Sequence, residues 1–101
     1  MTTIKSGKTV LISGRQKMAI PSGGAHVRAI EIRLDQLFRD RPAVVATIHS
    51  NSPGNTFAIW SVEYNVLGSQ TQIVIHATNT EVGIPLDFEF WCEYMVMGKM
   101  V

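Results

Sequence analysis

Apolar and polar residues alternate with a period of two along most of this chain. Between residues 26 and 35, Ile30, Ile32 and Leu34 fall on one side of an extended strand, and Glu31 and Arg33 fall on the other. Such alternation is typical of an antiparallel sheet that buries one face and exposes the other. Further strands are predicted in the segments 8–14, 15–21, 43–48, 57–66, 71–78 and 85–96.

Clusters of Gly, Pro, Ser and Asn separate these strands and predict turns. They stand at Ser13-Gly14, 21–24, 51–55 and 67–69. The segment 34–40 has the pattern of a short helical turn, which Pro42 would end. Six or seven strands with one apolar face each pack as two sheets. The sequence therefore predicts a single domain over residues 1–101, an all-β, six- to seven-stranded antiparallel β-sandwich.

Two strands carry most of the aromatic residues, and their phase predicts which rings are buried. In the last strand the core face is predicted to hold Leu86, Phe88, Phe90, Cys92 and Tyr94. Cys92 is then expected to be buried and unreactive, with a raised thiol pKa. Trp60 and Tyr64 also share a face, together with small and aliphatic residues, and we expect that face to lie in the core.

Trp91 has the opposite phase and lies among acidic residues. It shares its strand face with Asp87, Glu89 and Glu93. A large ring on a polar face has three explanations. The first is a subunit interface, the second is a β-bulge that changes the register and buries the ring, and the third is a ligand platform. The acidic residues themselves are interpreted as a solvated or interface face.

Composition excludes several classes of protein. Apolar residues make up 46% of the 101 residues, and 9 basic and 8 acidic residues give a net charge of +1. A disordered chain and a basic nucleic-acid-binding stripe are therefore not expected. There is one cysteine, no signal-peptide core, and no apolar run near the ~20 residues that span a bilayer. We expect synthesis in a reducing cytoplasm and no membrane insertion.

Motifs for catalysis and cofactor binding are weak. Ser6-Gly7-Lys8-Thr9 resembles the end of a phosphate-binding loop, but Thr2 occupies the position of its first glycine. The three histidines, His26, His49 and His76, lack metal-ligand spacing, although a threefold ring of one histidine around an oligomer axis stays open. There is no nucleophile elbow. We expect no enzyme activity, no cofactor and no metal site.

Several short motifs, in this order and spacing, resemble the H-type lectin domain of snail agglutinins, discoidins and bacteriophage tail-fibre tips. They are Ser6-Gly7-Lys8, the step from Leu34 to Phe38, Pro42-Ala43-Val44-Val45, the 51–55 turn, and the segment from Tyr94 to Gly98. The resemblance covers most of the chain. It implies a six-stranded antiparallel β-sandwich that assembles as a parallel homotrimer and binds N-acetylgalactosamine or related sugars near the subunit seams. The absence of a disulfide and of a signal peptide is closest to the phage-type members.

The chain departs from the family at the sugar contacts. Ala77 and Thr78 stand where the family has a Trp-His step, and Ala58 lies near the position of its sugar-binding arginine. The two loops that align with the family's sugar site are 21–28 and 78–85. Exposed sugar-binding candidates within them are His26, Arg28, Asn79 and Glu81, with Trp91 as the subunit-interface candidate.

Two functional hypotheses follow. In the first, the protein is a trimeric, lectin-like module of a bacteriophage tail or virion that binds a cell-surface glycan for host attachment. In the second, the same sandwich is a structural virion protein, a connector, cap or decoration that contacts other virion proteins without binding sugar. The usual role of the fold favours the first hypothesis, and the lost sugar contacts favour the second.

Overall fold

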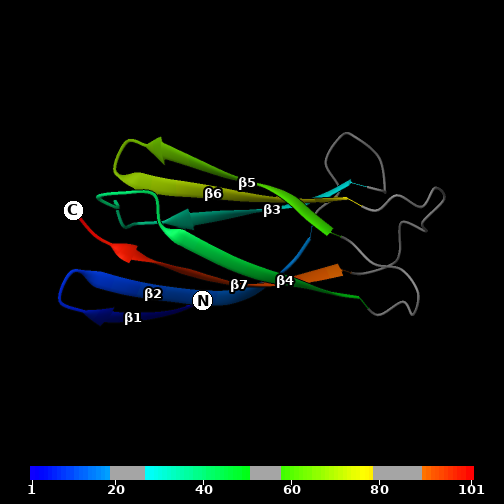
Figure 1. Cartoon of the computed structure of the whole chain (residues 1–101), viewed down its shortest axis with the longest axis horizontal. Helices are drawn as coiled ribbons and strands as arrows, with labels where there is room; N and C mark the ends of the chain where they lie inside the picture. Colours follow the sequence, from blue (N-terminus) through cyan, green and yellow to red (C-terminus); the bar gives the residue numbers. More distant parts are fainter. Residues whose placement is uncertain (19–26, 51–57, 79–89) are drawn as a thin grey trace.

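The structure, a computed structural model, describes residues 1–18, 27–50, 58–78 and 90–101 (Figure 1). These residues form seven strands in two antiparallel sheets, so the predicted all-β sandwich is confirmed. The strands are β1 (Thr2–Ser6), β2 (Thr9–Lys17), β3 (Val27–Leu34), β4 (Ala43–Ser50), β5 (Ala58–Leu67), β6 (Gln70–Thr78) and β7 (Phe90–Lys99). Within the described residues there is no helix that could cross a membrane.

The two sheets form the two layers of the sandwich (Figure 1). Sheet A has the strand order β1-β2-β7-β4, and sheet B has the order β3-β6-β5. Two tight hairpins, β1-β2 and β5-β6, turn at Gly7 and Gly68, whose φ angles are 59° and 63°. Glycine adopts this left-handed conformation without a steric cost, so both turns are set by local sequence.

The core lies between the sheets and follows the predicted phase. Its buried residues include Ile30, Ile32 and Leu34 of β3, and Phe90 and Cys92 of β7. Sheet A adds Val10, Ile12, Tyr94 and Val96, and sheet B adds Ile73, Ile75 and Ala77. The prediction that Cys92 is a buried residue of the last strand is therefore confirmed. Leu86 and Phe88, predicted in the same face, lie outside the described residues.

The predicted turn at Ser13-Gly14 is wrong. β2 runs without interruption through both residues and pairs with β7 along its whole length. Gly14 is needed for packing, because a Cβ atom there would lie 2.4 Å from the Tyr94 hydroxyl oxygen and 2.6 Å from its Cζ. The first strand, β1, was not predicted, because its five residues are all exposed and show no apolar face.

The predicted helical turn at 34–40 is also wrong. Phe38 instead forms an isolated bridge with Met100, and the Val101 amide donates to the Leu37 carbonyl. The Phe38 ring packs over Gly98, where a Cβ atom would lie 2.7 Å from the ring. The apolar spacing from Leu34 to Phe38 therefore belongs to two extended segments that both contribute to the core.

The β-bulge expected as one explanation of Trp91 occurs elsewhere. β7 pairs with both neighbours without a register shift, whereas β5 shifts register between Ile59 and Ser61. Beyond this bulge Tyr64 pairs with Ile73 and is half-buried against the core, as predicted. The side chain of Trp60 lies outside the described residues.

Candidate functional site

The two outer faces of the sandwich differ in chemistry. The outer face of sheet B is polar, and its side chains bond to one another across strands. His76 Nε2 lies 2.7 Å from Glu63 Oε1, and the Asn65 amide donates to Gln72 Oε1 at 3.1 Å. Hydrogen bonds from Gln72 and then Arg33 lower the pKa of the Glu31 carboxyl. These polar groups are already satisfied, which is typical of a solvated face.

The outer face of sheet A carries two rows of neighbouring residues that run across all four strands. The first row is entirely apolar and consists of Ile4, Leu11, Met97 and Ala43. The second row consists of Thr2, Ser13, Met95 and Val45. Ile4, Val45, Met95 and Met97 are 60%, 63%, 47% and 52% exposed. We call these eight residues, six of which are apolar, the apolar rows. Contiguous exposed apolar surface of this kind is typical of an interaction site.

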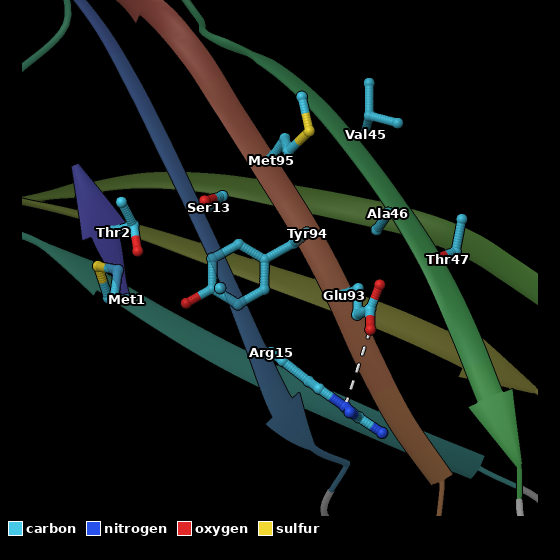
Figure 2. A pocket seen from close by; sticks show the side chains of 11 residues that line it. Met1, Thr2, Ser13, Arg15, Val45, Ala46, Thr47, Glu93, Tyr94 and Met95 are labelled. Atoms are coloured by element: carbon cyan, nitrogen blue, oxygen red, sulfur yellow. Dashed lines mark ion pairs between the residues drawn. The ribbon is translucent and has the colours of Figure 1, made fainter. Parts of the chain in front are cut away.

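A groove of about 610 Å³ lies along this face. Figure 2 shows Arg15 of β2 beside Glu93 of β7 at one end of the groove, with Met95 and Val45 beyond them. The remaining lining comes from Met1, Thr2, Ser13, Gly14, Ala46, Thr47 and Tyr94. Hydroxyl, charged and apolar groups therefore share one concave surface, within the range of about 300–1,000 Å³ usual for ligand pockets.

Trp91 lies next to the groove, on the same outer face, within a group of charged side chains. The Arg15 guanidinium carbon is 5.2 Å from the centroid of the Trp91 ring, and Arg15 Nε is 3.9 Å from Glu93 Oε1. On the other side of Glu93, His49 Nε2 is 3.6 Å from Oε2. We call Trp91, Arg15, His49 and Glu93 the Trp91 cluster. The cluster spans three adjacent strands of sheet A: Arg15 lies on β2, Trp91 and Glu93 lie on β7, and His49 lies on β4.

The geometry of the cluster does not match a hydroxyl–His–carboxylate relay. Thr47 Oγ1 and Glu93 Oε2 both approach the same histidine atom, His49 Nε2, at 3.3 and 3.6 Å. A hydroxyl–His–carboxylate relay needs the two groups on opposite ring nitrogens. Cys92 is no nucleophile either, since burial and then the Glu93 charge raise the pKa of its thiol to about 11.

Tyr94 lines the groove but does not titrate near neutral pH. Burial and then Cys92 raise the pKa of its phenol above the usual value. Among the described residues there is no group of three His, Cys, Asp or Glu side chains that could hold a metal. His49 and His76 lie on the opposite outer faces of the two sheets.

Arg28 does not lie where it was predicted. It was expected to be exposed, but it is 2% exposed and its guanidinium carbon lies 5.0 Å from the Phe90 ring. Burial lowers its pKa from the ordinary value. The physical reason is strand phase: Arg28 alternates with Ile30 and Ile32, so the same period of two turns it inward. The other sugar-binding candidates, His26, Asn79 and Glu81, lie outside the described residues.

The sequence predicted that Trp91 and Glu93 share the outer face of the last strand, but it did not predict that Arg15 and His49 lie beside them. Trp91 is half-buried there, in phase with Glu93, Met95 and Met97. Arg15 was missed because the predicted turn at Ser13-Gly14 broke β2 just before it. The apolar rows were missed because they bring together residues from four strands, and pairing register is not visible in one sequence.

Comparison with known proteins adds no relative: family models, curated proteins and solved structures all give no match to this chain.

Proposed function

We propose that this protein is a carbohydrate-binding, lectin-like module whose ligand site is the Trp91 cluster of sheet A, beside the apolar rows. The observation that carries the proposal is the half-buried Trp91 ring beside Arg15, Glu93 and His49 on an open sheet face. A sugar presents an apolar C–H face, which packs on an aromatic ring, and a rim of hydroxyls. Those hydroxyls are bound by planar charged groups such as a carboxylate and a guanidinium.

The ion pair between Arg15 and Glu93 is exposed and weak, so a ligand can replace it. The Arg15 and Glu93 side chains are 59% and 50% exposed, and ion pairs of this exposure contribute little to folding stability. A ligand therefore replaces a weak contact and a hydration shell at small cost. Because the Arg15 and Glu93 side chains are half exposed to solvent, each site is expected to bind sugar weakly.

The apolar rows support the second part of the proposal, assembly of copies as a homotrimer. Their methionine and aliphatic side chains adapt to a packed interface, and a chain with a net charge of +1 has little long-range repulsion between copies. Three weak sites in one particle gain roughly 10²-fold or more in avidity. Through the resemblance to phage-type H-type lectin domains, we propose attachment to a host-surface glycan as the role of such a trimer.

The apolar rows also favour a second candidate function. They cover much of the face that would otherwise be available to a ligand, as in a structural virion protein that only contacts copies of itself and other virion proteins. In that case the Trp91 ring is an interface anchor, and no glycan binds.

A glycan-array screen with the wild-type protein and a Trp91→Ala variant separates the two candidates. The proposal predicts binding to at least one glycan class and at least tenfold weaker binding by the variant, with its trimer retained in light scattering. If the array gives no binding, the structural candidate holds. Loss of the trimer in Trp91→Ala would identify Trp91 as the interface anchor.

A further inference from the structure

A second, smaller cavity lies between the two sheets, where the edge strands β4 and β5 face each other. It has a volume of about 160 Å³ and is lined by Arg41, Pro42, Val44, Val62, Tyr64 and Ile73. We call it the edge slot. Its lining comes from the two residues before β4, the start of β4, and strands β5 and β6, so all of it lies within the described residues.

The edge slot is an opening in the side of the core. Val44 and Tyr64 are half-buried against the core and Ile73 is fully buried, whereas Val62 is 37% exposed although it pairs with the buried Ile75. Among the described strands, β4 and β5 are edge strands that each pair with one neighbour, so no described strand of either sheet covers this side. Apolar surface at the slot is therefore available to a small apolar group.

Arg41 sets the charge at the slot. Its guanidinium carbon lies 5.7 Å from the centroid of the Tyr64 ring. Among the described residues no carboxylate lies within ion-pair distance of Arg41, in contrast to Arg15 and Arg33, which pair with Glu93 and Glu31. A guanidinium held against an aromatic ring, with donors still free for a planar acceptor, is suited to a carboxylate.

We propose that the edge slot binds a small monocarboxylate with a compact apolar body, with the carboxylate on Arg41 and the body against Val44, Val62 and Tyr64. The volume sets the size of the body, because an apolar protein cavity of about 150 Å³ holds one benzene molecule. Benzoate has this size and charge. The site is separate from the Trp91 cluster and does not depend on glycan binding.

Titration of the isotope-labelled protein with benzoate, followed by the NMR signals of the Val62 and Ile73 methyl groups, tests this proposal. We expect saturable shifts with a dissociation constant in the millimolar range, because few ligand atoms are buried. Arg41→Gln should weaken binding about tenfold or more, since it removes a charged hydrogen bond. Arg39→Gln is the matched control: it removes a nearby exposed arginine outside the slot and should leave binding unchanged. Val62→Phe fills the slot and should abolish the shift of the Ile73 methyl signals.

Three outcomes would overturn the proposal. One is the absence of saturable shifts at Val62 and Ile73. Another is equal weakening by Arg39→Gln and Arg41→Gln, which would show general attraction of an anion. The third is equally tight binding of benzyl alcohol, a neutral molecule of the same shape, which would show that Arg41 does not select a carboxylate.

Discussion

Gly14 leaves room for the Tyr94 ring, because glycine has no Cβ atom. The Tyr94 ring occupies the space that a Cβ atom of Gly14 would need, and the ring in turn lies under the groove. In the sequence, Ser13-Gly14 has the composition of a turn, but tertiary packing decides its role.

Gly14→Ala is predicted to destabilise the fold by about 1–3 kcal/mol, because the new methyl group displaces a packed ring. Chemical denaturation of the variant measures this. In a Gly14→Ala/Tyr94→Leu double variant, the cost of the alanine should largely disappear, since the smaller side chain leaves room. An undiminished cost in the double variant would contradict this packing role.

Cys92 predicts a dependence of stability on alkaline pH. Burial raises the pKa of its thiol from 9.0 to about 11, so the unfolded chain loses its thiol proton first. Below pH 9 the full stability is present, and as pH rises toward 11 a contribution on the order of 2 kcal/mol is lost. Denaturation curves at pH 8 and pH 10.5 measure this: between the two pH values the wild type should lose more of its free energy of unfolding than Cys92→Ala does. An equal loss in both proteins, or fast labelling of the native thiol at pH 8, would contradict the burial.

At the scale of elements, the strands differ in how much of the core they hold. β1 is an edge strand with every residue exposed, whereas β6 and β7 each lie between two neighbours and alternate buried residues along their length. Local opening follows such differences in burial and pairing.

Amide hydrogen exchange should therefore be fastest in β1 and slowest in the central strands β6 and β7. The β1 amides that bond to β2 should exchange at least tenfold faster than those of Val96, Cys92 and Ile75. Protection in β1 equal to that in β7 would show that β1 is held by more than its edge pairing, for example by a partner molecule on the apolar rows.

The sequence predicted those elements whose signal is local. Alternation located β3, β6 and β7, and Gly68 marked the turn between β5 and β6. The two wrong predictions concern segments whose conformation depends on distant contacts. Gly14 stays extended because it packs against Tyr94, and Phe38 stays extended because it bridges to Met100. Trp91 was placed by its phase, whereas its contact with Arg15 required the β2–β7 register. Arg28 was predicted to lie in the loop 21–28, whereas β3 already begins at Val27 and its alternation turns Arg28 toward the core.

At the scale of the whole molecule, the contrast between a hydrogen-bonded polar face on sheet B and the apolar rows on sheet A predicts association through sheet A. Val45→Lys places a charge within the rows and should convert a trimer to an 11.2 kDa monomer in light scattering at micromolar concentration. Val66→Lys is the matched control, because Val66 is 56% exposed on β5, in the other sheet, and its replacement should leave the trimer intact. A wild-type monomer under these conditions would contradict the assembly.

The proposed binding of sugar to the Trp91 cluster can be tested with two matched ion pairs. Arg15 and Glu93 form an exposed pair in the cluster, and Arg33 and Glu31 form an exposed pair on the opposite face. The measurement is calorimetric titration of the best glycan from the array into Arg15→Gln/Glu93→Gln and into Arg33→Gln/Glu31→Gln, both of which keep the net charge. We predict at least tenfold weaker binding for the first variant and unchanged binding for the second. Unchanged binding for the first variant would show that the Trp91 cluster is not the sugar site.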